Sequence, residues 1–202
     1  MNEILNIKIN KLINNTKGVF LSSECLYKGD FISLIQEKYL LPNNVVMTRE
    51  RIIKNNNKQA VIVIAITKEG NYILVSQNRI NGMTTLEFPS GYVEANESII
   101  DTTARELLEE TGYSSNDIKQ IDSYNTQIGI DSSIVNIVIA YNCIKTNKQN
   151  LGKYEYIKFD EFSFDELEEL IESNYISGVG NKLAFYELLN IISHKKKLIK
   201  KL

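Results

Sequence analysis

Short stretches rich in β-branched and aromatic residues, separated by turn residues, recur along most of the chain and predict strands. Residues 60–66 (AVIVIAI) form a continuous apolar run, which is typical of a strand buried on both faces. After the turn KEGN, residues 72–77 predict a second strand that pairs with it as a hairpin. Other predicted strands cover residues 19–27, 31–39, 45–53, 118–124, 134–142 and 154–159.

Three segments instead have the period of a helix. Ser98 can cap one of them, with Asp101 three residues later, and Gly112 stands where a helix ends. Its apolar positions form a stripe that we expect to face inward, on the side of the helix opposite three glutamates. The stripe consists of Ile100, Ala104, Leu107 and Leu108. Two more helices are expected at residues 164–173 and 181–196. This order of elements predicts an α/β (α+β) fold, a mixed sheet with helices on both sides.

Composition narrows the class of protein. The 202 residues are 43% hydrophobic, enough for one domain with an extra element, and a net charge of −2 argues against a nucleic-acid binder. No apolar run is long enough to span a membrane, and the N-terminus lacks the features of a signal peptide. Cys25 and Cys143 make no metal-ligand pattern, so we expect reduced core residues in a cytoplasmic protein.

The most unusual feature is a group of three acidic residues, Glu106, Glu109 and Glu110. On a helix their spacing places all three carboxylates on one face, where like charges repel and raise each other's pKa. Two explanations remain open: a solvated acidic face, or a site for a divalent cation. Carboxylate oxygens suit Mg²⁺ or Mn²⁺.

The surrounding residues, GYVEANESIIDTTARELLEETGY from Gly91 to Tyr113, resemble the Nudix box, Gly-x5-Glu-x7-Arg-Glu-U-x-Glu-Glu-x-Gly-U, where U is a bulky apolar residue. The resemblance implies a Nudix-type α/β/α sandwich and an Mg²⁺ (or Mn²⁺) site. It implies that Glu106, Glu110 and the Ser90 carbonyl bind metal, and that Glu109 binds a second ion or its water. Glu97 and Arg105 are implied to pair and brace the loop, a role that could also be purely structural.

The flanking segments are similar to those of the ADP-ribose pyrophosphatases of this family. Arg79 matches an arginine that contacts substrate in relatives, although it could instead cap a loop. Glu155, eleven residues before Glu166, matches a glutamate that activates the attacking water, although it could be an exposed carboxylate. Where relatives stack the adenine on an aromatic residue, this chain has Arg49, whose planar side chain can also stack on a base. His194, the only histidine, is expected to be solvated.

Taken together, the resemblance implies metal-dependent hydrolysis of a pyrophosphate bond in a small nucleoside diphosphate derivative, with ADP-ribose giving AMP and ribose 5-phosphate. Residues 1–56 would form a strand-rich arm that builds a homodimer, and residues 57–202 the Nudix hydrolase domain. Alternatives are a nucleotide sugar, an oxidised nucleoside triphosphate, a dinucleoside polyphosphate or an RNA cap as substrate. A non-catalytic nucleotide sensor is a further alternative, although all four box carboxylates are present.

Overall fold

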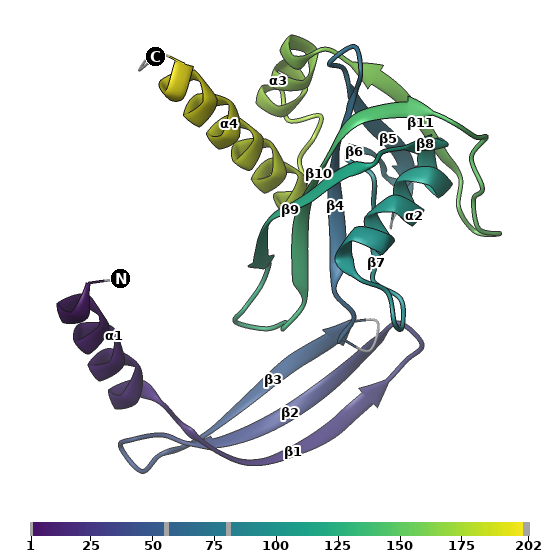
Figure 1. The fold of residues 1–202 in the computed structure, drawn as a ribbon. Coiled ribbons are helices and arrows are strands. Elements are labelled where there is room, and N and C mark those ends of the chain that lie inside the picture. The colour runs from purple at the N-terminus through teal and green to yellow at the C-terminus, as the bar shows by residue number, and fades with distance from the viewer. Residues whose placement is uncertain (1, 55–56, 80–81, 200–202) are drawn as a thin grey trace. The chain divides into compact units, whose positions relative to one another are not determined.

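The computed structural model describes residues 2–54, 57–79 and 82–199 and divides the chain into two compact units (Figure 1). One unit comprises Met1–Asn57 and Gln127–Ser133, and the other comprises Lys58–Thr126 and Ile134–Leu202. Among the described residues, no helix combines the length and the apolar character needed to cross a bilayer.

The first unit contains a three-stranded antiparallel sheet and one helix. The strands are β1 (Val19–Lys28), β2 (Ile32–Leu40) and β3 (Val46–Lys54), close to the predicted ranges, and they follow the chain order in the sheet. Helix α1 (Glu3–Thr16) was not expected; the side chain of Asn2 caps it by accepting a hydrogen bond from the Ile4 amide. Every residue of β1 is exposed, so this sheet leaves much of its surface uncovered within the unit.

The segment Gln127–Ser133 belongs to this first unit although it lies far along the chain. The Ile52 amide donates to the Ile130 carbonyl at 2.8 Å, and Lys54 forms a 2.5 Å salt bridge with Asp131, whose side chain is only 1% exposed. A hydrogen bond and an ion pair therefore hold the segment against β3.

The second unit is built on a mixed sheet, as predicted. Its strands are β4 (Ala60–Thr67), β5 (Tyr72–Asn78), β6 (Thr84–Glu87), β7 (Ser90–Tyr92), β8 (Tyr113–Ser114), β9 (Asp117–Asn125), β10 (Ile134–Lys145) and β11 (Ile157–Phe162). The order is β11-β5-β4-β10-β8, with β6 on β5, β7 on β4 and β9 on β10. Only β4 and β10 run parallel among the named pairs, and β4 and β5 form the expected antiparallel pair.

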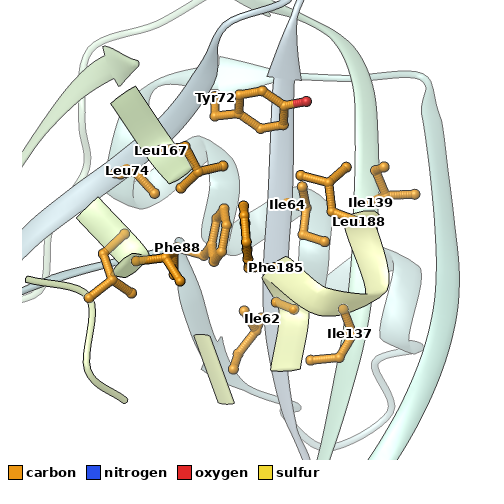
Figure 2. Packing of buried hydrophobic residues seen from close by; sticks show 13 residues of the cluster. Ile62, Ile64, Tyr72, Leu74, Phe88, Ile137, Ile139, Leu167, Phe185 and Leu188 are labelled. Carbon is orange, nitrogen blue, oxygen red and sulfur yellow. The ribbon is translucent and has the colours of Figure 1, made fainter. Parts of the chain in front are cut away.

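Helices cover both faces of this sheet, which confirms the α/β fold class. Along β4 the side chains alternate: Ile62 and Ile64 enter a cluster with α3 (Phe164–Glu172) and α4 (Val179–Ile199), while Val61 and Val63 enter a cluster with α2 (Ile99–Thr111). Figure 2 shows the first cluster, in which Phe88 and Phe185 are almost wholly buried. The continuous apolar run of β4 is thus buried on both sides, as its pattern predicted.

Several sequence expectations need adjustment. The last strand begins at Ile157 rather than at residue 154, because residues 150–156 form a loop after β10. Both cysteines are free; Cys143 is buried as expected, but Cys25 is exposed on β1, so its prediction as a core residue was wrong. Strand β1 contributes no buried side chain, and the residue type of Cys25 alone could not show that its strand is exposed.

Candidate active site

A cavity of about 560 Å³ in the second unit gathers most of the predicted site residues. This volume lies within the range typical of small-molecule sites. The lining comes from strands β4, β5, β6, β7 and β10, the C-terminal half of α2, the loop before β11 and the first turn of α4. It includes Arg79, Glu87, Ser90, Gly91, Glu106, Glu109, Glu110 and Glu155.

Helix α2 carries the acidic wall of the cavity, and local signals set its limits. Ser98 and Asp101 form a complete capping box, and Gly112 ends the helix in the left-handed conformation with φ of 73°. The predicted helix and both of its ends are therefore confirmed.

Arg105 joins the acidic residues at the centre of this wall. Its guanidinium group donates to both oxygens of Glu97 at 2.7 and 2.9 Å, to Glu106 at 2.7 Å and to Glu109 at 3.1 Å. It also donates to the Tyr92 carbonyl at 3.0 Å, so it ties the loop before α2 to the helix. The Arg105 hydrogen bonds lower the pKa of Glu97 to about 2, and the same contacts raise the pKa of Arg105.

Glu110 occupies a different environment. Its side chain is buried, with 5% of the residue exposed, and its Oε2 accepts a 3.0 Å hydrogen bond from the Ser90 amide. Burial raises the pKa of Glu110 to about 8, and the nearby charges of Glu106 and Glu155 act in the same direction. A carboxylate held this far from water favours either a proton or a bound cation.

The predicted orientation of α2 was only partly right. Leu107 of the expected inward stripe is buried, but Ile100 and Ala104 are exposed, and the rest of the buried face consists of Glu110 and three threonines. The hydroxyls of Thr103 and Thr111 donate to helix carbonyls four residues earlier, at 2.7 and 2.5 Å. Because these polar groups are satisfied within the helix, they can be buried, which hydrophobicity alone did not indicate.

Gly91 fits tightly against Glu106. A Cβ atom placed on Gly91 would lie 1.9 Å from the carboxyl carbon of Glu106, so only glycine allows this approach. Burial also raises the pKa of Glu106, although the Arg105 hydrogen bond opposes this effect. Strand β7 thus brings the Ser90 and Gly91 backbone directly against the two inner glutamates of α2.

Arg79 lies at the end of β5, in the same cavity. It forms a two-pronged ion pair with Glu87, through its Nε at 3.0 Å and through a second, shorter contact from its terminal nitrogen. Thr85 also donates to Glu87. These hydrogen bonds lower the pKa of Glu87 against the effect of its burial, and they raise the pKa of Arg79. Glu87 thereby fixes the guanidinium at the cavity wall.

Glu155 reaches the cavity from the loop between β10 and β11. Its Oε2 accepts a 2.8 Å hydrogen bond from the Gly152 amide, and the Glu155 amide donates to the Gly152 carbonyl at 3.0 Å. This turn holds the carboxylate within electrostatic range of Glu106 and Glu110. Arg49 belongs to the first unit, where it is exposed on β3, and His194 is exposed on α4 as expected.

The donor set fits a divalent cation. Two of the acidic side chains are largely buried with raised pKa, and a cation would offset both the loss of hydration and the repulsion between the carboxylates. Within the described parts of the chain, no three acidic, His or Cys side chains already surround one point, because Arg105 holds Glu106 and Glu109. Cation binding would therefore require these carboxylates to exchange hydrogen bonds with Arg105 for the ion.

Two further residues of the site were not predicted from the sequence. Glu87 pairs with Arg79, and Asn181 on α4 accepts a 2.8 Å hydrogen bond from the Phe88 amide through Oδ1. Asn181 is buried, so α4 anchors the segment that leads into β7. Glu87 lies just before the box and Asn181 lies far beyond it, and no local spacing marks either residue as a partner.

Comparisons with known proteins agree with this geometry. A model of the NUDIX domain matches residues 56–177. The chain is 32% identical over 158 residues to an ADP-ribose pyrophosphatase of Bacillus subtilis (strain 168), covering 77% of this chain and 84% of that protein. It is 28% identical over 179 residues to a methanol dehydrogenase activator of Bacillus methanolicus, covering 87% and 95%. A crystal structure of an ADP compounds hydrolase superposes with a TM-score of 0.79 at 20% identity, over 89% of this chain and 96% of that one.

Proposed function

The chain belongs to the Nudix family of hydrolases, and from this premise we propose that it cleaves ADP-ribose to AMP and ribose 5-phosphate with the help of Mg²⁺ or Mn²⁺. The observation that carries the proposal is the cavity itself. One wall presents Glu106, Glu109 and Glu110, and Arg79 lies on the lining of the same cavity. Acidic groups suited to a cation, together with an arginine suited to phosphate, match the charge distribution of a diphosphate with its counterion.

In the proposed reaction, a water oxygen forms a bond to one phosphorus, and the bridging oxygen leaves with the other phosphate. Glu106, Glu109, Glu110 and the Ser90 carbonyl would hold the cation, which supplies charge neutralisation for the diphosphate and a more acidic water. Glu155 accepts the proton of the attacking water as general base. Glu97 and Arg105 keep the loop and α2 in register.

Arg79 binds a phosphate oxygen in this proposal. Glu87 already holds the guanidinium from one side, so the side chain is oriented before substrate arrives. For Arg49, which lies in the first unit, we propose stacking on the base. Replacement of Arg49 by alanine should then raise the KM for ADP-ribose more than it lowers kcat.

We also propose that the strand-rich arm of residues 1–56, which makes up most of the first unit, forms a homodimer. Large apolar side chains are exposed on its sheet and on the turn after β1, among them Val19, Phe20, Leu21, Tyr27, Phe31 and Ile32. Apolar surface gathered in this way marks interaction sites. Light scattering coupled to size-exclusion chromatography tests the dimer, and a monomer mass at micromolar concentration would refute it.

A cytoplasmic location is proposed from the thiols. Cys25 and Cys143 are both free, and reduced cysteines fit a reducing compartment. Cell fractionation with an antibody to the protein tests this location.

The test of the reaction is chromatography of ADP-ribose after incubation with the purified protein, in Mg²⁺, in Mn²⁺ and in chelator. AMP and ribose 5-phosphate that form only with the cation are the expected result. Intact ADP-ribose in every sample would refute the substrate. A parallel panel of a nucleotide sugar, an oxidised nucleoside triphosphate, a dinucleoside polyphosphate and a capped RNA then identifies the alternative.

The role of Glu155 has a separate test. Glu155→Gln should lower kcat by roughly 100-fold or more, since general-base contributions are of this size. Wild-type turnover in this variant would refute the role of Glu155 as general base but would leave the proposed hydrolysis unaffected.

A further inference from the structure

The C-terminal end of α2 is capped by a distant part of the chain. The last carbonyl groups of any helix lack partners inside that helix. Here these are the carbonyls of Glu109, Glu110, Thr111 and Gly112, so two of them belong to glutamates that face the cavity. How they are bonded affects the position of the acidic wall.

Residues 145–150, at the end of β10 and the start of the loop to β11, supply the missing donors. The Lys145 ammonium donates to the Thr111 carbonyl at 2.6 Å, and the Asn150 amide donates to the Glu109 carbonyl at 2.9 Å. The amides of residues 146 and 147 both donate to the Gly112 carbonyl, at 3.0 and 3.1 Å. The loop is therefore fastened to the helix end residue by residue.

Gln149 completes this set in a way that the others do not. Its side-chain amide donates one hydrogen to the Glu110 carbonyl and another, at 3.1 Å, to the Ile157 carbonyl. Ile157 is the first residue of β11 and follows Glu155 by two positions. One half-buried side chain thus connects the backbone of a buried cavity glutamate to the base of the loop that carries Glu155.

We propose that Gln149 is a positioning residue for hydrolysis, which sets the spacing between Glu110 on α2 and Glu155 on the opposite loop. The inference rests on the function proposed above, in which Glu110 binds the cation and Glu155 activates water. Both glutamates come from separate elements, and a misplacement of about 1 Å between reacting groups can cost about 100-fold in rate. Gln149 is the described side chain that bonds directly to the backbone of both elements at this end of the cavity.

A purely structural helix cap would behave differently. Loss of a cap lowers stability and leaves the chemistry of the remaining folded molecules unchanged. A spacer between two catalytic elements instead changes kcat, leaves KM nearly constant, and loses its effect when Glu155 no longer acts as a base. These differences define the experiment.

The experiment compares wild type, Gln149→Leu, Glu155→Gln and the double variant, with the exposed neighbour Lys148→Leu as control. Leucine has a similar volume but no hydrogen-bond donor. We expect Gln149→Leu to lower kcat by about 10- to 100-fold with KM changed less than about threefold, and Lys148→Leu to leave both unchanged. In the Glu155→Gln background, the same substitution should lower kcat by less than about threefold further.

Two results would overturn the proposal: an unchanged kcat in Gln149→Leu, or a full multiplication of the two losses in the double variant. If Gln149→Leu does not fold, Gln149→Asn replaces it; its amide is too short to reach both carbonyls, so wild-type kcat in that variant also overturns the proposal. Wild-type turnover in Glu155→Gln is a separate result, because it refutes the role of Glu155 as general base and not the role of Gln149 in positioning.

Hydrogen exchange provides a readout without any substrate. Exchange of the amides in residues 150–157 should become at least about fivefold faster in Gln149→Leu than in Lys148→Leu. Equal exchange in the two variants would overturn the positioning role of Gln149 even if ADP-ribose proved to be the wrong substrate. A failure of the substrate assignment and a failure of the role of Gln149 are thus distinguishable.

Discussion

The burial of Glu110 predicts that the metal-free protein loses stability as the pH rises. The side chain has one hydrogen bond, from the Ser90 amide, and little contact with water, so its negative form is disfavoured. Its pKa is about 8 in the folded chain, compared with 4.5 for a free glutamate. Glu110→Gln removes the ionisation and keeps the size and an oxygen that can accept from Ser90.

The sign follows from proton linkage. Below the unfolded pKa the group is protonated in both states and its ionisation costs nothing. Between about pH 4.5 and pH 8 the unfolded chain releases the proton more readily, so the free energy of unfolding falls as pH rises. At ~1.4 kcal/mol per pH unit, the loss between pH 5 and pH 7.5 is on the order of 3 kcal/mol, which is roughly 6–12 °C in Tm for a chain of this size.

Thermal denaturation in chelator, followed at intervals between pH 5 and pH 7.5, is the assay. Wild type and Glu110→Gln should have similar Tm values at pH 5, and Glu110→Gln should become the more stable of the two as the pH rises. Addition of Mg²⁺ or Mn²⁺ at pH 7.5 should raise the Tm of wild type and have much less effect on the variant. Parallel pH curves in chelator would refute the buried, high-pKa glutamate on which the cation site is argued.

Further predictions concern single positions. Gly91→Ala places a Cβ atom 1.9 Å from the Glu106 carboxyl carbon and should lower kcat by about 100-fold. The control Gly129→Ala, whose Cβ meets no described atom within 4 Å, should leave kcat unchanged. Equal kcat values in the two variants would contradict the predicted clash. Asp131→Asn removes the buried acidic half of the ion pair with the partly exposed Lys54 and should lower stability by about 1 kcal/mol in urea unfolding. Ser163→Ala removes the capping box of α3 and should lower stability by about 1 kcal/mol with kcat unchanged; a fall in kcat would show that α3 affects the site.

The features that could be predicted from sequence depend on nearby residues. The limits of α2 follow from Ser98, Asp101 and Gly112, which act within one turn of the helix. The burial of β4 follows from its continuous apolar run, and the placement of acidic residues on one helix follows from their spacing. In each case the signal and the structure that it specifies lie within a few residues of each other.

The features that could not be predicted depend on partners on another element of the fold, most of them far along the chain. Glu87 pairs with Arg79 across two strands, Asn181 reaches back to Phe88, and Gln149 bonds to Glu110 and to the start of β11. The buried face of α2 was predicted wrongly in part for a different reason: its threonines and Glu110 can be buried because of the hydrogen bonds they make, within the helix for Thr103 and Thr111 and from the Ser90 amide for Glu110. A helical wheel weighs each side chain by hydrophobicity and has no information on those bonds.

Helix α2 combines features set by nearby residues with features set by distant partners. Its inner surface places Glu106 and Glu110 where burial raises their pKa, so in the absence of a cation the helix carries groups that oppose folding at neutral pH. Its ends are fastened by bonds that are independent of those carboxylates: the capping box at Ser98, the Gly112 turn and the donors of residues 145–150. Because the backbone of α2 is held at both ends, the carboxylates can remain in an unfavourable position that a bound cation would relieve. A preformed backbone that holds buried carboxylates favours a cation over water, which supports the metal-dependent hydrolysis proposed above.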